Sequence, residues 1–189
     1  MFLAALTLHT IVSGGVTRQY WEHNAARVIV GGMSNGAIMA LRFGCESDKA
    51  QTIVSVAGAL SANEVARCTH HASNVLLVNG TEDPLVKYTG SAILLGAYKT
   101  FETLANQRTC ATPALVKSFA KGTDGTSADI TRAHGCANNA RVALIAVAGG
   151  GHGWPGGSPY FSKAIVGVTS NAFDLSGYIM QFAFGETSL

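Results

Sequence analysis

The sequence predicts an α/β fold in which a mostly parallel sheet is flanked by helices. Three observations carry this prediction. Short apolar runs rich in β-branched residues alternate along the chain with stretches of helical spacing. Glycine or other turn residues follow several of these runs. Hydrophobic residues make up 48% and charged residues 13% of the 189 positions, enough for a substantial core. We expect one domain spanning residues 1–189.

The expected elements follow one another without a linker or an internal repeat. Residues 1–12 have a spacing that favours a packed helix over a secretion signal, because they lack a basic start and a cleavage-site pattern. The strand 27–31 precedes a helix that includes residues 37–43. Further strands are expected at 52–57, 74–79 and 141–147, a hairpin at 114–120 and 127–133, and helices at 91–107 and 173–184.

A G-x-S-x-G pentapeptide, Gly32 to Gly36, joins the first strand to its helix. Such a sharp turn strains the backbone of its central residue and exposes the side chain, while the flanking glycines let strand and helix approach. Ser34 is therefore a candidate nucleophile. The backbone N–H of Asn35 lies at a helix N-terminus, where it can stabilise a developing oxyanion.

A serine nucleophile needs a nearby base, and the base needs a carboxylate that fixes its tautomer. Asp83 and His152 each come just after an expected strand, as Ser34 does, and the carboxyl ends of parallel strands meet at one edge of a sheet. We expect these three side chains to form a triad. The less favoured alternatives are Glu82, Asp124, Asp129 and Asp174 for the acid, and His9, His23, His70, His71 and His134 for the base.

Four widely spaced cysteines, Cys45, Cys68, Cys110 and Cys136, fit two disulfides in an oxidising compartment, with three connectivities possible. Four buried free thiols in a cytosolic protein are the alternative. Cys68, His70 and His71 also resemble a set of zinc ligands, but no second pair at finger spacing supports a metal site. We expect neither a metal ion nor a cofactor.

The charge pattern excludes some partners. The net charge of +2 arises from scattered residues without a basic run, which argues against nucleic acid. The apolar start of the chain is too short to cross a bilayer, so no membrane partner is expected.

Three motifs together carry a family resemblance. The Gly-Met-Ser-Asn-Gly elbow, the segment Asn-Gly-Thr-Glu-Asp-Pro-Leu-Val-Lys-Tyr at 79–88 and Gly-Gly-Gly-His-Gly-Trp-Pro-Gly-Gly at 149–157 resemble the polyhydroxybutyrate depolymerase and feruloyl esterase family of secreted serine esterases. The order serine, acid, histidine is that of α/β-hydrolases. The resemblance implies an α/β-hydrolase fold, a secreted or periplasmic location, and disulfides joining Cys110 to Cys136 and Cys45 to Cys68.

The same resemblance sets the expected function. It implies hydrolysis of carboxylic esters through an acyl-enzyme, with polymeric or bulky substrates such as polyhydroxyalkanoate or feruloylated polysaccharide. Trp154, beside the histidine, is either a wall of the substrate site or a loop-packing residue. Family members carry more strands before the elbow and a His-Gly loop that donates a second oxyanion N–H, and we expect this chain to lack both. A catalytically impaired binding remnant and a serine peptidase on the same scaffold are the alternative functions.

Overall fold

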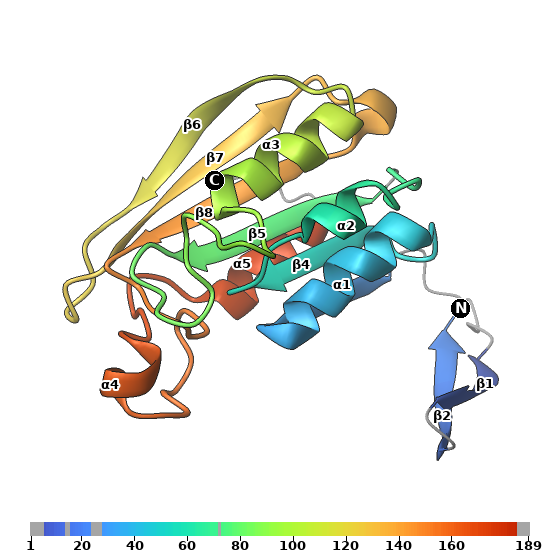
Figure 1. Cartoon of the computed structure of the whole chain (residues 1–189), viewed down its shortest axis with the longest axis horizontal. Coiled ribbons are helices and arrows are strands. Elements are labelled where there is room, and N and C mark those ends of the chain that lie inside the picture. The colour runs from blue at the N-terminus through green and yellow to red at the C-terminus, as the bar shows by residue number, and fades with distance from the viewer. Residues whose placement is uncertain (1–5, 14–15, 24–27, 72, 185–189) are drawn as a thin grey trace, which may run out of the picture.

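A computed structural model describes residues 6–13, 16–23, 28–71 and 73–184 of the chain (Figure 1). Its strands form two sheets. The two-stranded sheet pairs β1 (Leu6–Ser13) with β2 (Val16–His23) in antiparallel register. The six-stranded sheet has the order β3-β4-β5-β8-β7-β6 and carries the candidate functional residues.

Four strands of the large sheet are parallel, which confirms the predicted α/β class. They are β3 (Ile29–Met33), β4 (Thr52–Val56), β5 (Asn74–Gly80) and β8 (Val142–Ala148). The predicted hairpin extends the sheet beyond β8 as two antiparallel strands, β6 (Ala111–Phe119) and β7 (Ser127–His134). All five residues of β4 are buried, as expected for a strand covered on both faces.

Helices cover both faces of this sheet. In Figure 1, α1 (Asn35–Glu46) and α3 (Ala97–Gln107) lie in front of the sheet and α5 (Leu175–Phe184) lies behind it. Ile53 packs with the front helices, whereas its neighbour Val54 packs on the opposite side with α5 residues, as the two-residue period of a strand requires. The shorter helices are α2 (Ala62–Val65), η1 (Ala137–Asn139) and α4 (Lys163–Val166).

The helix expected over residues 1–12 is wrong for the part that the structure describes, because residues 6–13 form β1. This run contains β-branched residues at Thr7, Thr10, Ile11 and Val12, which favour a strand. Ser13 pairs with Val16, so only two residues separate the strands, a length typical of a hairpin. Residues 1–5 lie outside the described part of the chain. His9 and His23, expected in a helix and a loop, belong to β1 and β2.

The helix expected from residue 91 begins only at Ala97. The Ser91 hydroxyl accepts hydrogen bonds from the backbone N–H groups of Ile93 and Leu94 at 3.3 and 3.1 Å, which stabilises a turn there. Leu94 also forms a bridge with Ser61. These polar contacts outweigh the helical spacing of the apolar residues in this segment.

Among the strands that the structure describes, β3 pairs only with β4, so it is an edge strand of the large sheet. Beside it, a hollow of about 550 Å³ is lined by Val30, Met39 and Phe43, among others. An ion pair between Arg42 and Glu46, 3.1 Å apart, also belongs to its lining.

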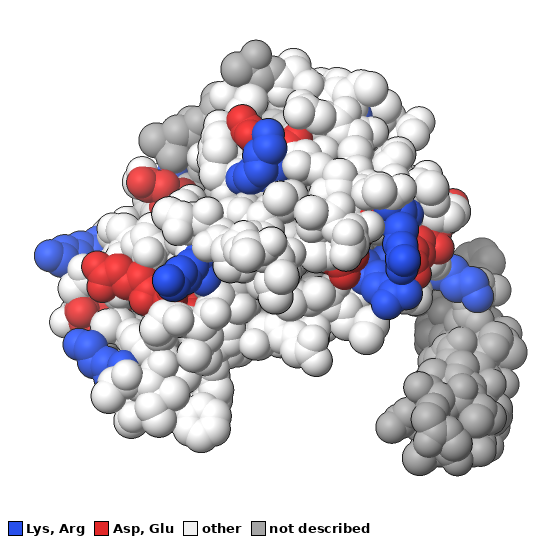
Figure 2. All heavy atoms as spheres, viewed as in Figure 1, with Lys and Arg blue, Asp and Glu red and all other residues white. Residues whose placement is uncertain are grey.

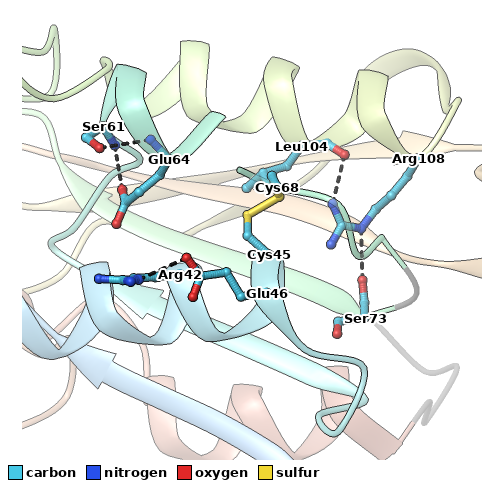
Figure 3. Close-up of a disulfide and its surroundings, with 9 residues drawn as sticks. All are labelled: Arg42, Cys45, Glu46, Ser61, Glu64, Cys68, Ser73, Leu104 and Arg108. Atoms are coloured by element: carbon cyan, nitrogen blue, oxygen red, sulfur yellow. Dashed lines mark hydrogen bonds and ion pairs between the residues drawn. A yellow bond between two sulfur atoms is a disulfide. The ribbon is translucent and has the colours of Figure 1, made fainter. Parts of the chain in front are cut away.

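Both disulfides have the predicted pairing. Cys45, in the last turn of α1, is bonded to Cys68, which follows α2 (Figure 3). Cys110 and Cys136 are bonded at the base of the β6–β7 hairpin. Because Cys68 is in a disulfide, it is not available as the metal ligand that the sequence left open.

Candidate active site

Ser34 is the single residue between β3 and α1 and has the strained backbone that the elbow predicts, with φ 58° and ψ −122°. Its N–H donates to the carbonyl of Val56 at 2.9 Å, and its carbonyl accepts from Ala37 and Ile38 in the first turn of α1. The side chain makes no capping hydrogen bond to the helix. The hydroxyl is therefore not used to cap α1, and its role as the nucleophile is a proposal.

The two glycines of the elbow are not equivalent. A Cβ atom on Gly32 would lie 2.5 Å from the carbonyl carbon and oxygen of Gly36, so only glycine lets the strand and helix approach here. A Cβ on Gly36 would meet no atom within 4 Å. The expectation that both glycines are needed for close approach is therefore correct for Gly32 and wrong for Gly36.

Asp83 is buried in the loop that follows β5. Its Oδ1 accepts hydrogen bonds from the backbone N–H groups of Leu85 and Val86 at 2.8 and 2.9 Å. Its Oδ2 lies 2.7 Å from Nδ1 of His152. The two backbone donors hold the carboxylate in one orientation, so that its second oxygen faces the imidazole.

His152 is buried in the glycine-rich loop after β8. The backbone N–H of His152 donates to the carbonyl of Val166, and the backbone N–H of Gly151 donates to the carbonyl of Val168 at 2.8 Å. The loop also lies directly against the end of β5, since a Cβ on Gly80 would come within 2.3 Å of the Gly150 carbonyl oxygen. Glycine is needed within the loop for the same reason, since a Cβ on Gly151 would lie 2.2 Å from the Val166 carbonyl oxygen.

Backbone hydrogen bonds hold the carboxyl ends of the four parallel strands in one row. Ser34 donates to Val56, Ala57 donates to Val78 at 2.8 Å, and Thr81 donates to Val147 at 2.9 Å. Neighbouring strands are about 4.8 Å apart, so β3 and β5, separated by β4, are about 10 Å apart. The structure thus places Ser34, Asp83 and His152 at the same edge of the sheet and brings the last two into direct contact.

The alternative acids have other partners. Asp124 accepts from Thr126 and Asn171 and fixes the connection in the hairpin, Asp129 accepts from Ser118, and Asp174 accepts from Ser176 at the start of α5. Glu82 is exposed. Among the alternative bases, His70 pairs with Asp48 at 2.7 Å.

The position of Asn35 suits the expected oxyanion donor, whereas the position of Trp154 suits loop packing better than a wall of the substrate site. Asn35 is the first residue of α1, where its N–H has no partner within the helix. Trp154 packs partly buried against the core under α5, and its indole N–H donates to the Ser176 hydroxyl at 3.2 Å. These contacts are those of a loop-packing residue, and its role as a wall of the substrate site remains a proposal.

Sequence reasoning missed Tyr160. Its hydroxyl donates to the backbone carbonyl of His152 at 3.0 Å, which ties the segment before α4 to the histidine loop. Burial raises the pKa of Tyr160, and the nearby Asp83 carboxylate raises it further, so the phenol stays protonated as a donor. The only sequence signal was an adjacent aromatic pair, Tyr160 and Phe161, shortly after the glycine-rich loop.

The described residues include no group of three or more histidine, cysteine, aspartate or glutamate side chains placed to hold a metal ion. In the same part of the chain, every helix is too short or too polar to pass through a bilayer.

The parallel sheet, the strand-to-helix elbow and the acid and histidine at the strand ends are the architecture of an α/β-hydrolase. The chain belongs to the phospholipase/carboxylesterase family, which matches residues 4–114. Over 174 residues it is 30% identical to a curated protein named "Putative esterase NocK" from Nocardia uniformis subsp. tsuyamanensis. The match covers 82% of this chain and 50% of that relative, so the chain spans about half the length of the relative it matches.

Proposed function

We propose that the chain hydrolyses carboxylic esters through an acyl-enzyme, with Ser34 as nucleophile, His152 as base and Asp83 as the carboxylate that orients it. The observation that supports this most is the buried 2.7 Å contact between Asp83 and His152 at the sheet edge that also carries the strained serine. Membership in a family of phospholipases and carboxylesterases supports the same reaction class.

The proposed reaction has two halves. Ser34 Oγ attacks the ester carbonyl carbon while its proton passes to Nε2 of His152, and the resulting oxyanion binds the N–H of Asn35. The bond to the alcohol then breaks, and the alcohol leaves with the proton from His152. Water attacks the acyl group in the same way, His152 takes its proton, and the serine hydroxyl is restored as the acid departs.

Bulky or polymeric esters are the proposed substrates. In its described residues, 57–71 and 73, the connection between β4 and β5 carries only the single-turn helix α2, so this segment supplies no large lid over the serine. Polyhydroxyalkanoate and feruloyl or acetyl esters of polysaccharide are the candidates that the motif resemblance supports, with Trp154 as a wall of the site. The two disulfides support a secreted or periplasmic location.

A fluorophosphonate titration tests the nucleophile. The wild-type chain should be labelled at one site per molecule, and Ser34→Ala should not be labelled. Hydrolysis of 4-nitrophenyl esters, compared with that of short peptide amides, tests the reaction class. Equal labelling of both chains, or turnover of amides without turnover of esters, would overturn the proposal.

A further inference from the structure

An exposed aromatic pair lies next to the candidate active site. The rings of Tyr160 and Phe161 are 5.1 Å apart in an edge-to-face arrangement, and these residues are 47% and 60% exposed. We call this pair the aromatic platform. The Tyr160 hydroxyl donates a hydrogen bond to the backbone carbonyl of His152, so the platform contacts the residue proposed as the base.

Other apolar side chains are exposed near the same loops. Ile165, on α4, is 54% exposed, and Leu85 is 56% exposed only two residues after Asp83. In Figure 2, the projection at the position of α4 is mostly free of charged side chains, which lie toward its margin. Exposed apolar side chains on loops beside a proposed active site are typical of a binding surface.

The platform is also ordered before any ligand arrives. The hydrogen bond from Tyr160 fixes one ring, and the edge-to-face contact orients the second ring against it. A ligand that packs on these rings therefore loses little free energy to ordering them.

We propose that the aromatic platform binds the apolar portion of the ester whose carbonyl carbon reacts with Ser34. The inference rests on the proposed function. A hydrocarbon or aromatic arm that extends from the reacting carbonyl past His152 covers the exposed faces of Tyr160 and Phe161. The platform then selects esters with a long apolar arm over short ones, because only the long arm reaches it.

The substrate-length test compares 4-nitrophenyl octanoate with 4-nitrophenyl acetate. The ratio of the two kcat/KM values should fall about tenfold in Phe161→Ser, since the variant removes most of one apolar contact face. Met180→Ser is the matched control, because Met180 is similarly exposed at 51% but belongs to α5. It should leave the ratio unchanged. A ratio in Phe161→Ser equal to that of the control would overturn the platform.

A binding measurement with inactive variants tests this inference separately from the proposed function. Ser34→Ala and Ser34→Ala/Phe161→Ser are titrated with 4-nitrophenyl octanoate, and the Kd should be about tenfold higher for the double variant. If the wild-type chain hydrolyses no ester but this difference is found, the proposed function fails and the platform stands. If the two Kd values are equal, the platform is overturned whether or not the chain is active.

Discussion

His152 Nδ1 lies 2.7 Å from Asp83 Oδ2, and both side chains are only 1% exposed. The two residues are far apart in the sequence and meet because β5 and β8 are neighbours in the sheet. Burial strengthens this contact, because the low dielectric constant of the protein interior screens the attraction between the two groups less than water does. The contact therefore fixes which imidazole nitrogen faces the carboxylate, and in the proposed mechanism the other nitrogen, Nε2, takes the proton of the serine.

Asp83→Asn should lower kcat by about ten-thousand-fold and leave the fold intact. The amide oxygen can still accept from Leu85 and Val86, but the amide nitrogen replaces the oxygen that accepts from His152 Nδ1. The imidazole is then held in the wrong tautomer. Steady-state hydrolysis of a 4-nitrophenyl ester measures the loss, and thermal unfolding checks the fold.

The exposed neighbour Glu82 provides the control for this substitution. Glu82→Gln removes one carboxylate from the same loop without touching His152, and its kcat should stay within a few-fold of the wild type. Equal losses in Asp83→Asn and Glu82→Gln would show that the loop, not the buried contact, determines activity.

The two elbow glycines should respond in opposite directions to alanine. Gly32→Ala places a methyl group 2.5 Å from main-chain atoms of Gly36 and should lower the free energy of unfolding by about 1–3 kcal/mol. Gly36→Ala meets open space on a helix and should raise that free energy by about 0.5–1 kcal/mol. Urea denaturation of the two variants measures both changes. Similar destabilisation by both would contradict the packing seen at the elbow.

The position of the candidate site could be predicted from the sequence because it depends on strand ends. The apolar runs before Ser34, Asp83 and His152 indicate buried strands, and parallel topology brings their carboxyl ends together. The hydrogen bonds that orient Asp83 could not be predicted in the same way, since they depend on the path of a loop. Nor could the contact of Tyr160 with His152, which joins two segments without regular structure.

Local patterns failed where another interaction outweighed them. Residues 6–13 show a spacing compatible with a helix. Their β-branched residues, and the strand-forming residues 16–23 that follow, favour a hairpin instead. At the start of α3, a turn held by Ser91 replaces a helix that apolar spacing predicts. The spacing of apolar residues indicates which side chains can share a buried face. It does not indicate whether a side-chain hydrogen bond will hold the backbone in another conformation.

Loss of the Cys45–Cys68 disulfide should reduce stability by about 3 kcal/mol. The bond closes a loop with a sequence separation of 23 residues and restricts the unfolded chain. The double variant Cys45→Ala/Cys68→Ala should show this loss in urea denaturation. Removal of the Cys110–Cys136 bond should cost a similar amount, because its separation of 26 residues is nearly the same. A wild-type chain whose unfolding is insensitive to dithiothreitol would contradict both pairings.

Stability should also fall in mild acid because of His71. Burial lowers the pKa of this imidazole, and the positive charge of Arg108 lowers it further. A backbone hydrogen bond with His70 and the charge of Asp48 oppose this shift with smaller effects. Arg108 is itself buried: its Nε donates to the carbonyl of Ser73 and its Nη1 to that of Leu104 (Figure 3), and burial lowers its pKa to about 10. A protonated His71 is therefore repelled by a guanidinium that two backbone carbonyls hold in place.

The sign of the effect follows from proton binding. Below pH 6.5 the unfolded chain protonates His71 more readily than the folded chain, so the unfolded state binds more protons and stability decreases as the pH falls. His71→Gln removes this contribution, and the stability difference between wild type and variant should change between pH 7.5 and pH 5. His134→Gln, at an exposed position, is the control. A wild-type-minus-His71→Gln difference that is constant with pH would show that the imidazole titrates alike in both states.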